Sequence, residues 1–187
     1  MKRKTLVSFP LFVLLLSVAI QTALVTAANM RSFIEAVRRK AAVVYVGEVK
    51  DVQILERTKF DLKARAHIKV SAVLRGADSK PAEATLHYSS YDDKTPILAG
   101  GPQYQLRQGT WVVIFNDSLQ GSVPPGYLIQ GDPKELLQRV EDLRDSLAKY
   151  SADQLKMQEI NDDDRQVQLE LYEKLLEHLR SLGSGAR

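Results

Sequence analysis

Residues 60–76 read FDLKARAHIKVSAVLRG, and this stretch decides the fold. Every even position from Phe60 to Leu74 is apolar, and Val73 is the one apolar residue at an odd position. Successive side chains of a β-strand point to opposite faces of a sheet, so this alternation predicts a long strand with one buried face. Ile68 should therefore face the core, and Lys69 the solvent. The strand is expected to end at residues 75–76.

Four more strands are expected on either side of this one. Residues 42–55 (AVVYVGEVKDVQIL) are rich in valine, and their apolar phase shifts at Lys50 with Gly47 nearby, which indicates a bulge or bend. The others are residues 82–91, 109–116 and 127–130, of which 109–116 is apolar on both faces and so central. Turns separate the strands, and a fifteen-residue strand can bend to serve both halves of a barrel. We expect a curled antiparallel sheet or a small barrel of five strands, mainly β, within residues 29–131.

The C-terminal segment, residues 132–187, is expected to be helical. Asp132 can cap a first helix, with Pro133 at its first position and Glu135 completing a capping box. A second helix is expected from about residue 161 to residue 182, and a short one at residues 29–40 with Ser32 as its cap. The two C-terminal helices should form a hairpin or pack onto the barrel. Their apolar stripes are Leu136, Val140, Leu143 and Leu147, and Leu171, Leu175, Leu179 and Leu182.

Residues 1–28 have the pattern of a signal peptide. Three basic residues at positions 2–4 precede an apolar run, and small residues follow at positions 25–28. Cleavage is expected after Ala27 or Ala28, which makes the chain secreted or periplasmic. The alternative is an uncleaved N-terminal membrane anchor, because residues 6–28 could nearly span a bilayer.

Charge and cysteine content exclude some classes of protein. The 187 residues carry 26 basic and 23 acidic side chains, and loss of the three basic residues of the leader leaves 23 of each. A neutral mature chain has no overall basic field for nucleic acid, so we expect no nucleic-acid partner. The chain has no cysteine, which excludes a disulfide scaffold.

The sequence shows no catalytic or metal motif with the required spacing, so we expect no catalytic residue, cofactor or metal. His87, Ser89 and Tyr91 alternate along residues 82–91, but side chains two apart on a strand lie about 7 Å apart at the backbone, too far for a catalytic contact. The acidic run 162–164 is contiguous and lacks the glycine of a calcium loop. Acidic residues next to an Asn161 cap favour a helix start instead.

Aromatic and basic residues give the candidate contact surface. Residues 92–108 contain two prolines and two glycines, which predicts a long loop. Tyr104 and Arg107 lie in this loop and Tyr91 just before it, so these three are the candidate partner-binding residues. Trp111 lies in an apolar strand and is expected to belong to the core.

Three segments resemble the core strands of netrin-like domains, a family that includes the tissue inhibitors of metalloproteinases. They are AVVYVGEV at residues 42–49, VSAVLRG at 70–76 and GTWVVIF at 109–115. The preceding RSFIEAVRRKA, residues 31–41, is similar to the family's approach to its first strand. The resemblance covers residues 31–130 and implies an OB-type barrel that binds protein outside the cytoplasm. The family's inhibitors chelate the zinc of a protease through an N-terminal cysteine, which this chain lacks, so no functional residue is carried over.

The sequence therefore predicts an exported, non-enzymatic protein-binding module of a bacterial envelope or periplasm, contacting the membrane only if its leader is uncleaved. One alternative is a metalloproteinase inhibitor acting through its N-terminus or the loop from Asp92 to Gln108. A second alternative is an enzyme of unknown class.

Overall fold

The computed structural model describes residues 34–76, 80–95, 104–122 and 127–184. The predicted leader and the Ser32 cap lie outside these ranges, whereas residues 34–40 are helical, as predicted for the end of the first helix. In the described part of the chain, no helix combines the length and apolar character needed to cross a membrane.

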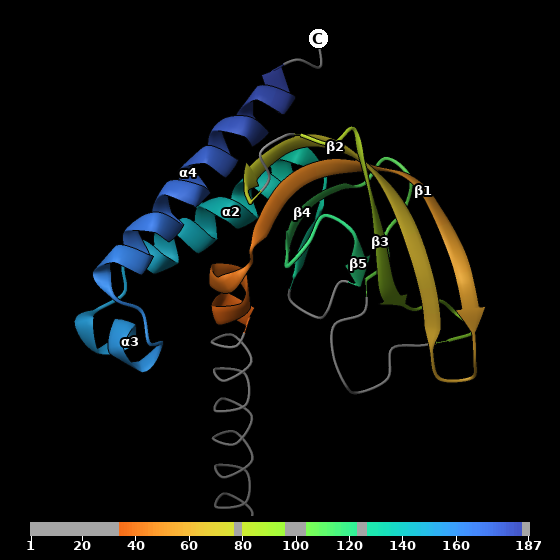
Figure 1. The fold of residues 1–187 in the computed structure, drawn as a ribbon, viewed down its shortest axis with the longest axis horizontal. Coiled ribbons are helices and arrows are strands. Elements are labelled where there is room, and N and C mark those ends of the chain that lie inside the picture. The colour runs from red at the N-terminus through yellow and green to blue at the C-terminus, as the bar shows by residue number, and fades with distance from the viewer. Residues whose placement is uncertain (1–33, 77–79, 96–103, 123–126, 185–187) are drawn as a thin grey trace, which may run out of the picture.

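Six strands form a single sheet in the order β5-β3-β2-β1-β4-β6, as Figure 1 shows in part. Neighbouring strands pair antiparallel, except that β3 and β5 run parallel. The strands are β1 (Val43–Arg57), β2 (Leu62–Arg75), β3 (Glu83–Ser90), β4 (Trp111–Asn116), β5 (Gly121–Ser122) and β6 (Leu128–Gly131). Five of them match the predicted strands, and β5 falls in a segment that the sequence predicts as a turn.

The sheet is open in the described residues, so the predicted five-stranded barrel is not confirmed. Strands β5 and β6 are its two edges, and no pairing between them joins the ends of the sheet in the described residues. Two residues of β5 reach β3, with Leu86 opposite Gly121 and His87 opposite Ser122. The fold is a mixed α/β structure: a curled six-stranded sheet followed by C-terminal helices (Figure 1).

Strand β1 is long and irregular, as its shifted apolar phase predicts. Its register against β2 shifts at four places, one of them between Val49 and Asp51, where Lys50 is the extra residue. Bulges of this kind bend a strand and increase its twist. The predicted bulge near Lys50 is therefore confirmed.

Gly47 allows β1 and β2 to approach closely at the bend. A Cβ atom at this position would lie 2.4 Å from Cγ2 of Ile68 and 2.7 Å from the backbone oxygen of Lys69. Neither distance is a possible contact, so the strands would have to separate.

We expect Gly47→Ala to destabilise the fold by about 1–3 kcal/mol, as overpacked core positions do. Gly183→Ala is the matched control, because a Cβ at Gly183 would meet no atom within 4 Å, and its change in unfolding free energy should stay within about 0.5 kcal/mol. Denaturant melts of the two variants test this. Equal stability of both variants would show that the close approach is not tight.

The alternating pattern of β2 is confirmed over most of its length. Its even positions from Leu62 to Val70 are buried, whereas Lys63 and Lys69 are exposed and His67 is half-buried. Phe60 departs from the pattern, because it precedes the strand and is 60% exposed. Beyond Val70 the alternation ends, since Ser71 has no partner in the register with β1.

Each face of the sheet has its own hydrophobic core. The concave side, here called the inner face, buries Val49, Ile68, Leu86 and Ile114 among others. The opposite, outer face buries Val44, Val46, Val113 and Phe115 against the helices. Alternate residues of β4 belong to different cores, so this strand is buried on both faces, although it lies next to the edge strand β6 rather than at the centre of the sheet. Trp111 is half-buried and packs against the helix-side core, as predicted.

The helices are α2 (Pro133–Ala148), α3 (Ala152–Met157) and α4 (Asp162–Ser184). The capping box of Asp132 and Glu135 is present in α2, and the Asn161 side chain accepts a hydrogen bond of 2.7 Å from the backbone of Asp164. Both predicted caps are thus confirmed. The sequence analysis missed α3, although Ser151 and Gln154 form a capping box at the same spacing.

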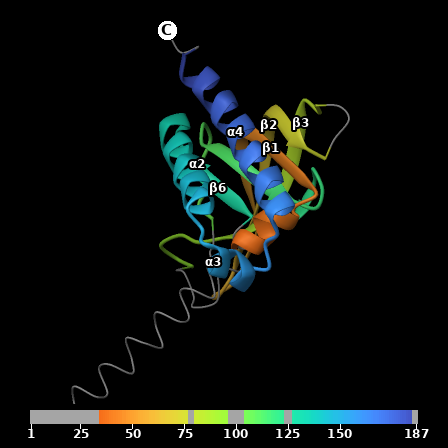
Figure 2. The same ribbon diagram turned by 90° about the vertical axis from the view of Figure 1, so that its left-hand side faces the viewer.

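Helices α2 and α4 form the predicted hairpin and also pack onto the sheet (Figure 2). Ion pairs join Glu141 to Arg180 at 3.1 Å and Arg144 to Glu173 at 3.0 Å. Because the higher number on α2 meets the lower number on α4, the two helices run antiparallel. Leu136, Val140, Leu175 and other leucines of both stripes share one core with the outer face of the sheet.

Candidate functional site

The distal half of β1 has a free edge. Pairing with β4 covers only Val43–Glu48. Two backbone hydrogen bonds of 2.8 Å follow, in which the Val49 amide donates to the Thr110 oxygen and the Gly109 amide donates to the Val49 oxygen, and the pairing ends there. From Lys50 to Arg57, β1 has β2 on one side and, among the described residues, no strand on the other. Figure 1 shows these two strands extending together away from the helices, and we call them the arm. Unpaired backbone groups along an edge strand are a template for a further strand.

Three large apolar side chains that lie close together in the sequence are exposed at the tip of the arm. Ile54 is 58% exposed, Leu55 is 49% exposed, and Phe60, in the turn between β1 and β2, is 60% exposed. The ammonium of Lys59 lies 5.3 Å from the centre of the Phe60 ring. Exposed apolar side chains are ordinary when scattered, but their grouping at a free edge indicates a contact surface.

The regular part of the free edge is short. Register shifts leave Lys50 and Leu55 without a partner residue on β2, and Asp51–Ile54 pair without interruption between them. Bulges limit uncontrolled edge-to-edge pairing in native sheets. Here the bulges at Lys50 and Leu55 flank four residues, Asp51–Ile54, that keep regular strand geometry.

The outer face of the arm carries paired charges. Lys50 contacts Glu48 at 2.5 Å, and Lys63 contacts Glu56 at 2.9 Å. Ion pairs as exposed as these add little to stability, on the order of 0–1 kcal/mol each. They do fix a pattern of charge beside the free edge.

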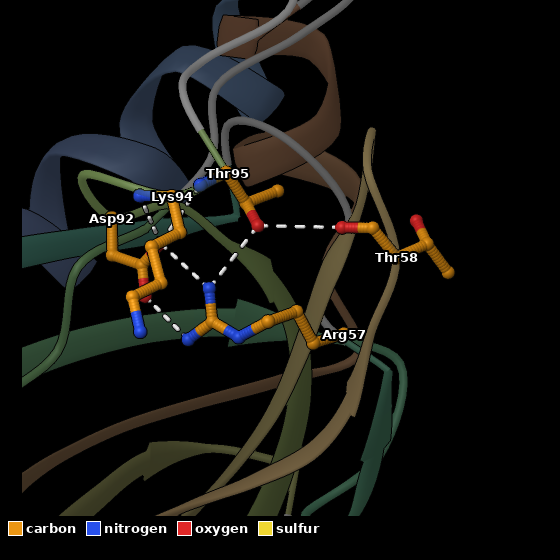
Figure 3. A network of polar contacts seen from close by, with 5 residues as sticks. All are labelled: Arg57, Thr58, Asp92, Lys94 and Thr95. Carbon is orange, nitrogen blue, oxygen red and sulfur yellow. Dashed lines mark hydrogen bonds and ion pairs between the residues drawn. The ribbon is translucent and has the colours of Figure 1, made fainter.

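A clamp holds the tip of the arm against the segment that follows β3 (Figure 3). The Arg57 guanidinium donates to both carboxylate oxygens of Asp92, at 2.8 and 2.5 Å, and to Oγ1 of Thr95 at 3.2 Å. The backbone amides of Lys94 and Thr95 also donate to Asp92, at 3.0 and 2.9 Å. Oγ1 of Thr95, in turn, reaches the backbone oxygen of Thr58 at 3.4 Å. The clamp positions the arm rather than offering a reactive group.

The pKa of the Asp92 carboxyl is held well below its usual range, chiefly by the hydrogen bonds from Arg57. The folded pKa is lower than the unfolded one, so the stabilisation is complete above the unfolded pKa, near about 4, and is lost as the pH falls. We expect acid to loosen the arm tip below about pH 4. Hydrogen exchange at residues 54–62, measured at pH 7 and pH 3 after correction for intrinsic rates, tests this expectation.

Asp92→Asn is the matched variant, because it removes the charge and keeps the shape. Its arm tip should be loose at both pH values, so the acid-induced difference should shrink. An unchanged difference in Asp92→Asn would assign the acid response to another group.

The three predicted contact residues do not form one surface. Tyr104 is only 7% exposed and packs in the inner core, edge-on to Tyr88, with ring centres 6.5 Å apart. The prediction of Tyr104 as a surface contact is therefore corrected: its position in a loop did not reveal that its ring covers the sheet. Arg107 is exposed, and Tyr91 is half-buried. Residues 96–103 of the predicted loop, and the N-terminus invoked for protease inhibition, lie outside the described residues.

The histidines give no catalytic geometry. His87 and Ser89 are exposed and lie on the same face of β3. A contact that the sequence analysis missed joins Ser71 to His178 of α4 at 2.9 Å, across 107 positions of the chain, and burial lowers the pKa of that histidine. Neither residue lines any of the hollows described below, so we assign the pair to helix–sheet packing.

Two hollows of the described surface lie against the C-terminal helices. The smaller one, between residues 34–40 and the helices, has a volume of about 20 Å³, enough for one water molecule. A broader groove between α2 and α4 is lined by charged residues such as Arg144, Glu173 and Arg180, which pair across it. No three His, Asp or Glu side chains of the described ranges gather closely enough to hold a metal ion.

Comparison of the sequence with protein families and curated proteins gave no match. No protein-family model matches the chain, and no curated protein matches it in sequence. The netrin-like assignment therefore stays a prediction, and the geometry of the arm is the basis for a functional proposal.

Proposed function

We propose that this chain is an exported, non-enzymatic protein-binding module of a bacterial envelope or periplasm that binds its partner through the arm. The surface is the free edge of β1 from Lys50 to Arg57, together with the apolar side chains of Ile54, Leu55 and Phe60. The partner is a protein that presents an extended segment.

The free edge is the observation that carries the proposal. An extended segment that adds to a sheet edge gains backbone hydrogen bonds, while alternate side chains give specificity. On the arm, backbone pairing is open at Asp51–Ile54, and the exposed Ile54 and Leu55 offer apolar contacts beside it. The clamp between Arg57 and Asp92 supports this role, because a fixed arm loses less entropy on binding than a mobile one.

A netrin-like, OB-type barrel is part of the proposal. OB folds are partly open barrels. Support comes from the bent β1, which pairs with both β2 and β4, and from the parallel pairing of β3 with β5. Export is supported by the sequence of residues 1–28.

Affinity capture from envelope extract tests the binding role. Wild-type chain and two variants serve as bait: Ile54→Asp, which places a charge on the apolar tip, and Ser89→Asp, which places one on an exposed position of β3. We expect at least a tenfold loss of the captured protein with Ile54→Asp and no loss with Ser89→Asp. Equal capture by all three baits would reject the arm as the binding surface.

Cell fractionation tests the export part. The chain should be found outside the cytoplasm with Ala28 or Asn29 as its first residue, as N-terminal sequencing would show. Recovery of chain beginning with Met1 in the membrane fraction would contradict cleavage and favour the anchored alternative.

A further inference from the structure

We infer that the edge strand β6 and the helix α2 beside it form a second binding site, which takes an extended peptide segment with an acidic side chain directed towards the helices. Strand β4 separates β6 from β1, so this site is distinct from the arm. The inference goes beyond the proposed function and does not depend on it.

Strand β6 offers unpaired backbone groups. It is one edge of the sheet and pairs with β4 alone among the described strands. The Phe115 amide donates to the Tyr127 oxygen at 2.8 Å, which makes these two opposed residues a hydrogen-bonded pair. Bonded and non-bonded pairs alternate along an antiparallel ladder, so Leu128 and Gln130 turn their backbone N–H and C=O groups away from β4. An extended segment can add to these groups as a further strand.

A hollow of about 270 Å³ lies along this edge. Leu128 and Ile129 both line it, although Leu128 belongs to the inner core and Ile129 to the core on the helix side. Successive residues of a strand point to opposite faces, so a hollow that touches both lies at the edge of the strand rather than over one face. The hollow is therefore where an added strand would run.

Helix α2 forms one wall of the hollow, through Arg139, Asp142, Leu143 and Ser146. Their spacing places these residues in one stripe along the helix. The stripe is about 10 Å long at 1.5 Å per helical residue. Residues of a strand rise about 3.3 Å each, so the wall matches about three residues of an extended segment.

The charges of the hollow favour an anionic segment. Among the described residues that line it, two are arginines, Arg38 and Arg139, and one is an acid, Asp142. The Gln138 side chain donates to the Asp142 carboxylate at 3.0 Å, whereas Arg139 has no ion pair or hydrogen bond with another described residue. The excess positive charge can be balanced by one carboxylate of a ligand.

Arg38 adds a poorly hydrated cation to the site. Its guanidinium lies 5.6 Å from the centre of the Phe115 ring, on the helix side of the sheet. Burial lowers the pKa of Arg38, and the charge of Glu35 offsets this only in part. A further carboxylate beside a desolvated guanidinium stabilises its charged form.

The position of the two arginines selects an acidic side chain rather than a chain terminus. The backbone of an added strand lies in the plane of the sheet, and its alternate side chains point to the helix side. Arg38 and Arg139 both belong to helices on that side. An acidic side chain there points towards the arginines, and an apolar side chain two positions away faces Leu143 and Ile129.

NMR titration of the isotope-labelled exported chain with short peptides tests the inference. The probes are acetyl-TETLT-amide and acetyl-TLTET-amide, which set glutamate and leucine on one face for the two possible strand directions. We expect one of them to shift the backbone amide signals of Leu128 and Gln130 and of the α2 residues near Arg139. Glutamine in place of the peptide's glutamate should weaken binding at least fivefold.

Arg139→Gln should also weaken binding at least fivefold. Its matched control is Arg180→Gln, which removes the same charge from an exposed helical position outside the hollow and should leave the affinity unchanged. Thermal melts check that both variants fold, since both arginines are exposed.

Unshifted Leu128 and Gln130 signals at several millimolar peptide would overturn the inference, and so would equal affinity for the glutamate and glutamine peptides. Tighter binding of acetyl-TQTLT with a free terminal carboxylate would reject the acidic side chain in favour of a chain terminus. Shifts confined to Asp51–Ile54 would reject this site and support the arm. Failure of the arm is measured separately, by envelope capture with Ile54→Asp, so the two proposals stand or fall independently.

Discussion

A chain that ends after Gln130 is expected to lose cooperative unfolding and to aggregate. The reason is that α2 and α4 are not an independent unit. Leu136, Val140 and Leu175 share a core with Val46 and Phe115 of the sheet, and all five side chains are fully buried. Removal of the helices would expose the outer face of the sheet to water, and an apolar face of that size favours association.

Polar contacts across the same boundary strengthen this expectation. The Arg75 guanidinium of β2 donates to Gln168 of α4 at 3.3 Å, and Ser71 contacts His178. These partners would also be lost on truncation.

Solubility and thermal melts of residues 29–130 measure the effect, with the chain ended after Ser184 as the control. The control keeps every described helix and should melt like the full mature chain. A soluble fragment 29–130 with a cooperative melt would show that the sheet folds alone and that the helices are an accessory unit.

Ile68→Ala is expected to destabilise the fold by about 2–5 kcal/mol, as large-to-small changes in a core do. Ile68 is fully buried in the inner core, where it lies opposite Val49 of β1 and Ala84 of β3. The close approach of β1 at Gly47 leaves the neighbouring backbone little room to collapse into the cavity.

Lys69→Ala is the matched control at the next position, because the Lys69 side chain is exposed on the opposite face. The free energy of unfolding of Lys69→Ala should fall by no more than about 0.5 kcal/mol. Denaturant melts give both free energies. Similar losses for the two variants would mean that β2 does not have one buried and one solvated face.

The elements that could be predicted are those whose signal is local. Alternation along residues 62–70 predicted the buried face of β2, and the capping box at Asp132 predicted where α2 begins. Strand β5 could not be predicted, because two residues are too few to show an alternation of apolar and polar side chains. The order of the strands in the open sheet could not be predicted either, because it depends on pairing between distant positions.

The parts of the candidate site that were missed depend on contacts between distant positions. Arg57 and Asp92 are 35 positions apart, and either residue alone reads as an ordinary surface charge. Tyr104 was predicted as a surface contact because it lies in a loop, and only its packing against Tyr88 shows otherwise. The free edge of β1 likewise could not be predicted from the sequence, because it depends on where the pairing of β4 with β1 ends.

Photo-crosslinking from position 53 in living cells tests most directly whether the arm is a protein-binding surface. Gln53 is exposed at the centre of the regular edge, and Ser89, exposed on β3, is the control position for the same photoreactive residue. The account predicts covalent protein adducts from position 53 that are absent or at least tenfold weaker from position 89. Adduct yields from position 53 no greater than those from position 89 would contradict it.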